Sequence, residues 1–227
     1  MGYYLDDYVL EAIILAGGEA WRLKPHTYTP KPLVEIRDGL TLLEYQVSWL
    51  RVHGYDRVLV ASRKKLLEDL DVEWVLEGEE KLGTGGALKN ALKECYGDYV
   101  YVMNVDDIVF YNPLELLGDI IRTPSMVGVV LGAVAKYPFG VMELEGNLIV
   151  NFVQKPSLPY YTNAGHYLFD RERIRPLLPD KGDFENEILP RLARERKLMM
   201  HRLRGSWITI NTMKDLLQAR EILERGV

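Results

Sequence analysis

The chain has 227 residues, of which 48% are hydrophobic, so it can bury a large core and fits one α/β domain better than two small ones. Its 28 basic and 33 acidic residues form no basic run or arm suited to nucleic-acid phosphates, which argues against a nucleic-acid partner but leaves a small anionic substrate open. One cysteine and no bilayer-spanning apolar run exclude a disulfide framework and a membrane protein, so we expect a soluble, cytoplasmic protein.

Strands and helices alternate along the first half of the chain. An apolar run at 9–15 ends in glycines, which is typical of a buried strand entering a turn, and residues 41–53 carry apolar side chains at helical spacing before Gly54. The pattern continues with strands at 57–61, 72–76 and 99–103 and with helices at 86–95 and from Pro113 onward. This alternation predicts an α/β fold with a doubly wound, mostly parallel sheet flanked by helices.

The pattern changes after residue 125. Strand-like segments follow one another without helices between them at 126–134, 140–144, 148–153 and 162–169, and they predict mixed or antiparallel strands in the C-terminal half. Helices at 184–194 and 213–225 flank a last strand at 197–203. No linker or repeat interrupts the chain, so we expect a single domain over residues 1–227.

A glycine turn follows the first strand. In an open parallel sheet, ligands bind beyond the carboxyl ends of the strands, and this turn lies at such an end. Paired glycines let backbone N–H groups approach phosphate oxygens, and Arg22 can neutralise the phosphate charge. Alone, such a turn is equally typical of an ordinary strand-to-loop connection. The candidate phosphate-binding residues of the turn are Leu15, Ala16, Gly17 and Gly18.

A lysine between two prolines comes next. Pro30 and Pro32 fix the local backbone, so Lys31 can reach a phosphate with little loss of entropy. The string Leu-Ala-Gly-Gly, then Arg22-Leu23-x-Pro25-x-Thr27, then Pro30-Lys31-Pro32-Leu33 resembles the signature of sugar-phosphate nucleotidylyltransferases, which include mannose-1-phosphate guanylyltransferases and glucose-1-phosphate thymidylyltransferases. The resemblance continues in order through 82–88, 104–106, 154–156, 163–165 and 207–212, so it covers nearly the whole chain.

The resemblance implies a Rossmann-like nucleotidyltransferase fold and a reaction. A nucleotidyl group passes from a nucleoside triphosphate to a hexose 1-phosphate, pyrophosphate leaves, and a nucleotide sugar forms. Residues 1–125 are then the nucleotide-binding half, and residues 126–227 are the sugar-phosphate-binding half. The same resemblance implies Mg²⁺ as cofactor and gives Arg22, Lys31, Asp106 and Lys155 the catalytic roles.

The nucleotide-binding half contains a second glycine turn and an acidic loop. Gly83 and Thr84 open a helix, where exposed amides can contact a nucleobase or a phosphate, although helix capping explains such a turn as well. Glu80 belongs to the acidic loop 77–86, which we expect to read the base. A carboxylate accepts both N–H groups on the pairing edge of guanine, and this weakly favours GTP over UTP or dTTP.

Two adjacent carboxylates follow the apolar strand at 99–103. Paired carboxylates are suited to hold Mg²⁺ against triphosphate oxygens, whereas an exposed acidic turn is the ordinary alternative. By position, Asp106 matches the metal-binding aspartate of the family and Asp107 is the weaker candidate.

Residues of the second half are expected to bind the sugar phosphate. The resemblance makes Lys155, within Gln154-Lys155-Pro156, the contact for the phosphate, although an isolated lysine is usually exposed to solvent. The resemblance also places Asn163 and Gly165 against the sugar. Glu185 matches an acidic position near the sugar, but a carboxylate at the start of a helix is equally favoured by the helix dipole.

The sequence departs from the family pattern at four positions. Ala20 replaces a glycine, Val105 replaces a small residue, Gln154 replaces a glutamate, and Thr209 stands where the family has a second metal-binding aspartate. A hydroxyl is a poorer Mg²⁺ ligand than a carboxylate, so a second hypothesis stays open: a catalytically weak homologue that binds nucleotide as a regulatory or assembly subunit. A dinucleotide-binding oxidoreductase is disfavoured because the three-glycine fingerprint is missing. The sequence leaves homo-oligomer formation open.

Overall fold

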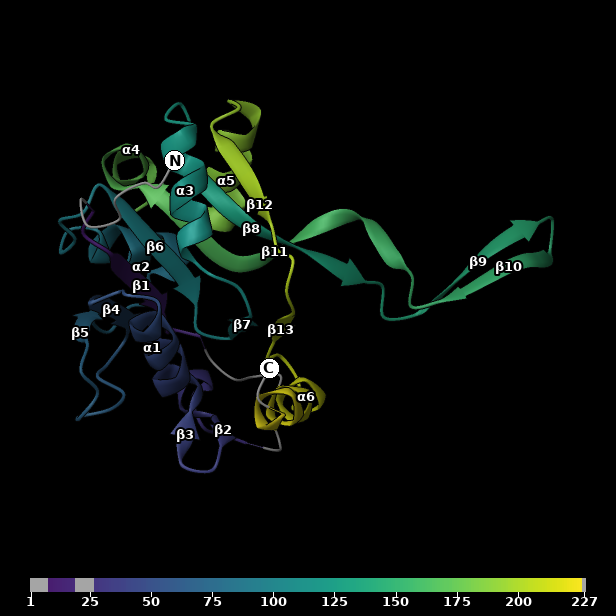
Figure 1. Ribbon diagram of the computed structural model, residues 1–227, viewed down its shortest axis with the longest axis horizontal. Helices are drawn as coiled ribbons and strands as arrows, with labels where there is room; N and C mark the ends of the chain where they lie inside the picture. The colour runs from purple at the N-terminus through teal and green to yellow at the C-terminus, as the bar shows by residue number, and fades with distance from the viewer. Residues whose placement is uncertain (1–7, 19–26, 226–227) are drawn as a thin grey trace.

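A seven-stranded sheet forms the centre of the molecule (Figure 1). The computed structural model describes residues 8–18 and 27–225. In spatial order, the strands are β12 (Leu198–Arg202), β8 (Gly128–Lys136), β11 (Ser157–Asp170), β6 (Tyr99–Asn104), β1 (Glu11–Leu15), β4 (Arg57–Ser62) and β5 (Glu73–Leu76). All neighbouring pairs are parallel except those of β11, which is antiparallel to both β6 and β8. The mostly parallel sheet with antiparallel additions predicted from the sequence is confirmed.

Helices cover both faces of the sheet. The buried side chains of β1 alternate between the two faces, because successive residues of a strand point in opposite directions: Ala12 and Ile14 join one hydrophobic core, and Ile13 and Leu15 join the other. The first core includes α1 (Leu42–Val52), α3 (Leu114–Arg122) and α6 (Met213–Glu224); the second includes α2 (Gly83–Ala91), α4 (Arg171–Ile174) and α5 (Phe184–Arg194). A sheet buried on both faces explains the continuous apolar runs in its strands.

Local signals set several helix ends. Thr41 caps α1 through a reciprocal capping box with Glu44, and Gly54 follows this helix with a φ of 85°, a conformation that favours glycine. The predicted helix at 86–95 is displaced, since α2 begins at Gly83 and ends at Ala91. Tertiary contact explains the earlier start, because Gly85 N–H donates to the carbonyl of Gly182.

The sequence did not predict four short strands. β2 (Glu35–Arg37) pairs with β3 (Leu40–Thr41), and β7 (Asp107–Val109) pairs with β13 (Trp207–Thr209), both antiparallel. Strands of two or three residues are too short to show a period. The β7–β13 pair lies at the carboxyl end of β6, and it brings two segments about a hundred residues apart in sequence into register.

A hairpin of β9 (Gly140–Glu145) and β10 (Leu148–Gln154) extends away from the body of the molecule at the outer ends of β8 and β11 (Figure 1). We call residues 134–161 the arm. Its strands agree with the sequence prediction. No helix within residues 8–18 and 27–225 is long and apolar enough to cross a bilayer.

Candidate active site

A pocket of about 250 Å³ opens at the carboxyl ends of β1, β4 and β6. This is the edge of the sheet where an open α/β fold binds its ligands. The loop before α2 and the start of α5 complete the wall. The lining residues are Leu15, Gly17, Gly18, Lys31, Ala61, Glu77, Lys81, Gly83, Thr84, Ala87, Asn104, Val105, Asp106, Asp183 and Glu185.

The first glycine turn contributes three residues to the lining of the pocket. Leu15, Gly17 and Gly18 line it, whereas Ala16 is buried behind it with its N–H bonded to the carbonyl of Ala61. A Cβ at Gly17 would lie 3.0 Å from Glu77 Oε1, so the flexible Glu77 side chain would have to shift slightly to admit a larger residue. Arg22 and Ala20 lie outside the described residues, and the predicted role of Arg22 stays a prediction.

The second glycine turn forms the opposite wall. Gly83 has a φ of 77°, and a Cβ there would lie 2.6 Å from the carbonyl oxygen of Gly182, so conformation and space both require glycine. Thr84 N–H donates to Asp183 Oδ1 at 3.1 Å, and the Thr84 hydroxyl donates to the Glu185 carboxylate. Burial raises the pKa of Glu185. Predicted nucleotide-binding and sugar-binding residues therefore meet on one wall.

The acidic loop before α2 presents a different carboxylate than expected. Glu80 is exposed and forms an ion pair with Lys181 at 3.0 Å, outside the pocket lining. Glu77 lines the pocket instead, and its carboxylate accepts the N–H of Leu82 at 3.2 Å. Lys81 also lines the pocket, and no sequence motif singled it out. The loop enters the site, but through residues on either side of the predicted one.

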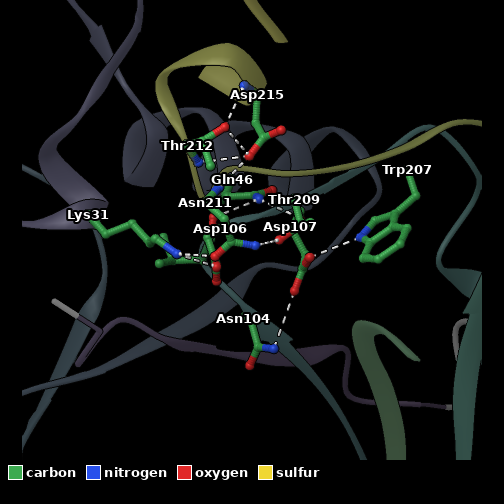
Figure 2. Close-up of polar contacts among 11 residues, drawn as sticks. Lys31, Gln46, Asn104, Asp106, Asp107, Trp207, Thr209, Asn211, Thr212 and Asp215 are labelled. Carbon is green, nitrogen blue, oxygen red and sulfur yellow. Dashed lines mark hydrogen bonds and ion pairs between the residues drawn. The ribbon is translucent and has the colours of Figure 1, made fainter. Parts of the chain in front are cut away.

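A lysine–aspartate pair lies at the floor of the pocket (Figure 2). Lys31 begins the short 3₁₀ helix η3 (Lys31–Leu33), and its Nζ donates to Asp106 Oδ2 at 2.6 Å and to Asn211 Oδ1 at 3.1 Å. The Asn211 amide in turn donates to Thr209 Oγ1 at 3.0 Å. Lys31 and Asp106, both predicted to be catalytic, are thus in direct contact. Asn211 belongs to the motif at 207–212, but its contact with Lys31 was not expected.

Asp107 plays a different part from its neighbour Asp106. Its buried carboxylate accepts Trp207 Nε1–H at 2.9 Å and Asn104 Nδ2–H at 3.3 Å (Figure 2). Burial, and then the charge of Asp106, raise the pKa of Asp107 to about 7. A Cβ at Gly165, whose φ is 72°, would lie 1.9 Å from Asp107 Oδ2. Asp106 faces the pocket, and Asp107 anchors the turn from behind.

Buried polar side chains hydrogen-bond to the backbone of the turn between β6 and β7, which carries Asp106. The Gln46 amide donates to the carbonyls of Val105 and Asp107 at 3.0 and 2.8 Å. His166 Nε2 donates to the same Asp107 carbonyl at 2.9 Å, which leaves Nδ1 to accept the Tyr101 hydroxyl at 2.7 Å. Burial lowers the pKa of His166 to about 4, so this ring is neutral at pH 7.

The other predicted sugar-phosphate residues lie outside the pocket lining. Asn163 donates to the Tyr167 hydroxyl at 2.8 Å and accepts the N–H of Gly165 at 3.0 Å, at a shift of register in β11. Gly165 is in contact range of Asp107 and so lies beside the site. Gln154 and Lys155 are exposed at the root of the hairpin, where the N–H of Lys155 donates to the carbonyl of Phe139. The structure does not bring these two residues to Asp106.

The oxygen donors of the site suit a hard cation only in part. Asp106, which is 22% exposed, supplies a carboxylate at the pocket, and Asn211 and Thr209 supply neutral oxygens nearby. Over residues 8–18 and 27–225, no group of three or more His, Cys, Asp or Glu side chains could hold a metal ion. This donor set fits Mg²⁺ if phosphate oxygens and water complete its coordination.

Comparison with known proteins identifies the family of this chain. The family model described as "Nucleotidyl transferase" matches residues 11–226. The mannose-1-phosphate guanylyltransferase catalytic subunit beta of Danio rerio is 33% identical over 92% of this chain and 63% of its own length. The mannose-1-phosphate guanyltransferase of Saccharomyces cerevisiae is 31% identical over 92% and 63%. The chain therefore spans less than two thirds of these curated relatives.

Solved structures share the fold. HddC from Yersinia pseudotuberculosis superposes with a TM-score of 0.73 at 23% identity, covering 94% of this chain and 99% of HddC. A putative glucose-1-phosphate thymidylyltransferase from Bacillus anthracis, in complex with a sucrose, gives a TM-score of 0.71 at 21% identity and covers 96% of both chains.

Proposed function

This chain belongs to the nucleotidyl transferase family, and we propose that it transfers the nucleotidyl group of a nucleoside triphosphate to a sugar 1-phosphate. The products are a nucleotide sugar and pyrophosphate. The observation that carries the proposal is the Lys31–Asp106 pair at the floor of a pocket whose walls are two glycine turns. This pocket offers backbone N–H groups, a lysine and a carboxylate to a bound triphosphate.

The proposed reaction needs alignment and neutralisation of charge. An oxygen of the sugar phosphate attacks the α-phosphorus, the new P–O bond forms, and the bond from the α-phosphorus to the bridging oxygen breaks as pyrophosphate leaves. Two anions must approach each other, so the protein assists mainly through position and positive charge. We assign this role to the N–H groups of Gly17 and Gly18 and to the ammonium groups of Lys31 and Lys81, with Arg22 as a further cation.

Asp106 is the residue that would hold Mg²⁺. When bound, this ion would neutralise the triphosphate oxygens and stabilise charge on the transferring group. In the structure, the Lys31 ammonium forms an ion pair with Asp106 Oδ2 at 2.6 Å, so this oxygen already has a cationic partner. We propose that Lys31 leaves Asp106 for a phosphate oxygen when metal and nucleotide bind. Its long, flexible side chain allows this exchange without movement of the backbone.

GTP is the nucleotide we propose. Glu77 places a carboxylate inside the pocket beside the first glycine turn, where it can accept the two N–H groups of guanine. Two observations on relatives support the same choice: the Danio rerio and yeast proteins are named for guanylyl transfer, and HddC has been solved in complex with GMP-PN. Tighter binding of UTP or dTTP than of GTP would overturn the choice of base but not the reaction.

The sugar phosphate is proposed to be a hexose 1-phosphate. Glu185 supports a sugar site, because its half-buried carboxylate lines the pocket and bonds to Thr84. Asn163 and Gly165, beside Asp107, are proposed to extend that site, and Gln154 and Lys155 to bind the phosphate. For these last two residues, binding requires movement of the arm, since their positions in the structure lie outside the pocket lining.

A specific observation keeps a second function in view. Thr209 and Asn211 place a hydroxyl and an amide beside Asp106, and neither carries a charge to attract Mg²⁺. A chain with this site that bound nucleotide without turning it over would serve as a regulatory or assembly subunit.

One experiment separates the two functions. Pyrophosphate release is measured with Mg²⁺ for each pair drawn from GTP, ATP, UTP and dTTP and from several hexose 1-phosphates, and nucleotide binding is measured in parallel. Release that requires both substrates supports the transferase. Saturable nucleotide binding without release from any pair supports the subunit.

A further inference from the structure

Buried polar side chains are concentrated at the turn between β6 and β7, which carries Asp106. Among residues 8–18 and 27–225, the buried polar or charged side chains, tyrosine apart, are Glu11, Gln46, Ser62, Asp107 and His166. Three of these five, Gln46, Asp107 and His166, belong to this turn or bond to its backbone. Hydrogen-bonded polar networks in a protein interior restrict the local backbone to one arrangement. Their concentration at one turn therefore points to a requirement on the geometry of that turn.

The backbone carbonyls of three consecutive residues in this turn all accept hydrogen bonds from other segments. Gln46 Nε2, on α1, donates to the carbonyls of Val105 and Asp107 at 3.0 and 2.8 Å (Figure 2). The carbonyl of Asp106, between these two, accepts the N–H of Ile210 at 2.9 Å. The backbone on both sides of Asp106 is thus bonded to α1 and to the segment that follows β13.

A second side chain holds the carbonyl of Asp107. His166 Nε2, on β11, donates to it at 2.9 Å, and Nδ1 of the same ring accepts the Tyr101 hydroxyl at 2.7 Å. A carbonyl only accepts hydrogen bonds, so the proton of the neutral ring is on Nε2. Because the Tyr101 proton goes to His166, the Tyr101 oxygen accepts from the Tyr111 hydroxyl, which lies 2.7 Å away. This chain of bonds fixes the orientation of the imidazole that faces the turn.

We propose that Gln46 and His166 are positioning residues of the transferase: by holding the carbonyls on either side of Asp106, they fix how its carboxylate enters the pocket. This inference rests on the proposed function of the site. Neither side chain is among the residues that line the pocket, so both act through the turn and not on a substrate. Outer partners that orient a metal-binding group typically change metal affinity or activity by about tenfold to a hundredfold.

The competing explanation is that these side chains only stabilise the fold. A structural role predicts a lower melting temperature alone, whereas a positioning role predicts that a folded variant also loses Mg²⁺-dependent binding of nucleotide. Glu11 provides the matched comparison, because its buried carboxylate accepts the N–H groups of Tyr96 and Gly97 at 2.8 and 2.6 Å. This residue begins β1, and the opposite end of that strand lines the pocket at Leu15.

The first test compares Gln46→Met with Glu11→Gln. Methionine is similar to glutamine in length but donates no hydrogen bond, and Glu11→Gln weakens a buried network far from the pocket. The affinity for GTP is measured with a chelator and with Mg²⁺, and the ratio of the two dissociation constants gives the contribution of the metal. Gln46→Met should lower this ratio at least about tenfold, and Glu11→Gln should leave it unchanged.

The two ways in which this test can fail are distinct. A ratio of one in the parent would contradict the metal role of Asp106 in the proposed function, and this proposal with it. A ratio well above one that Gln46→Met retains would overturn the positioning role and leave the proposed function intact. Neither readout requires turnover.

A second test follows the turn itself and needs no ligand. The N–H of Ile210 bonds to the carbonyl of Asp106, so its rate of hydrogen exchange measures opening of the turn. The N–H of Val127 bonds to the carbonyl of Lys197 at 2.7 Å and serves as a reference away from the turn.

Loss of either donor should loosen the turn more than the rest of the fold. Gln46→Met and His166→Met should each accelerate exchange at Ile210 at least about tenfold more than at Val127. Glu11→Gln should accelerate exchange at Ile210 no more than at Val127. Acceleration at Ile210 that does not exceed that at Val127 in either donor variant would mean that these side chains only stabilise the fold, and would overturn the proposal.

Discussion

Replacing Lys31 by methionine should change metal binding and turnover in opposite directions. In the structure, the Lys31 ammonium lies 2.6 Å from Asp106 Oδ2, and both side chains are largely shielded from water, with 13% and 22% exposure. A divalent cation and an ammonium about 4 Å apart repel by about 2 kcal/mol even at the dielectric constant of water, twice the energy for two unit charges, so the Lys31 ammonium would oppose Mg²⁺ held by Asp106. Lys31→Met should therefore bind Mg²⁺ at least about twentyfold more tightly in the absence of nucleotide.

The same substitution removes a cation from the reacting phosphates. Loss of one such donor typically lowers the rate by about a hundredfold to a thousandfold, so turnover should fall although the metal binds better. Calorimetric titration with Mg²⁺ and pyrophosphate release give the two readouts. Lys81→Met is the matched control, because it removes a pocket lysine that does not pair with Asp106, and its Mg²⁺ affinity should change little. Unchanged Mg²⁺ affinity in a folded Lys31→Met protein would refute the competition of Lys31 with the metal.

Three further predictions concern the metal ligands, the buried His166 and the predicted sugar-phosphate contact. Thr209→Asp adds a charged oxygen, so it should tighten Mg²⁺ binding in the nucleotide complex by about tenfold or more and raise any transfer rate. The same variant should lower the melting temperature of the metal-free protein, because residue 209 pairs with the buried Asp107. Equal Mg²⁺ dependence in variant and parent would contradict this prediction. The pKa of His166 is about 4 in the folded protein and about 6.5 in the unfolded chain. At pH values between these two, His166 takes up a proton only when the protein unfolds. The parent should therefore lose about 3 kcal/mol of stability relative to His166→Gln as the pH falls from 6.5 to 4. If the stabilities of parent and His166→Gln change equally with pH across that range, His166 does not titrate as described. Comparing the two proteins also cancels the contribution of Asp107, whose raised pKa makes stability change with pH in the opposite direction. Lys155→Ala should have the same melting temperature as the parent, because the Lys155 side chain is exposed. If Lys155 binds the sugar phosphate, the variant should transfer the nucleotidyl group at least about a hundredfold more slowly. Full activity of the variant would show that Lys155 is not part of the site.

Elements with strong local signals could be predicted from the sequence. The helix at 184–194 has the predicted bounds, and the predicted strand at 57–61 ends one residue before the observed strand β4. β7 and β13 could not be predicted, because three residues show no period and their pairing depends on segments distant in sequence. Helix α2 was displaced for a similar reason, since its start is fixed by contact with Gly182.

The site shows the same division. The turn at 15–18 and the positions of Lys31 and Asp106 follow from motifs, and the structure brings all three to one pocket. The contact of Lys31 with Asn211 joins residues 180 apart, which no local pattern specifies. In the acidic loop, the positive φ of 80° at Gly78 belongs to a backbone path that places Glu77 and Lys81 in the pocket and Glu80 outside it. Composition alone could not choose among these neighbours.

The fate of the two ends of the triphosphate tests the proposed reaction most directly. GTP labelled at the α-phosphorus is incubated with hexose 1-phosphate, Mg²⁺ and either the parent or Asp106→Asn, and the labelled products are separated and counted beside the pyrophosphate released. We predict that the label enters a nucleotide sugar, that one pyrophosphate appears for each nucleotide sugar, and that Asp106→Asn reduces both at least about a hundredfold while its melting curve stays close to that of the parent. Bound nucleotide whose label never enters a sugar product, or equal transfer by parent and Asp106→Asn, would contradict the reaction or the placement of its centre at Asp106.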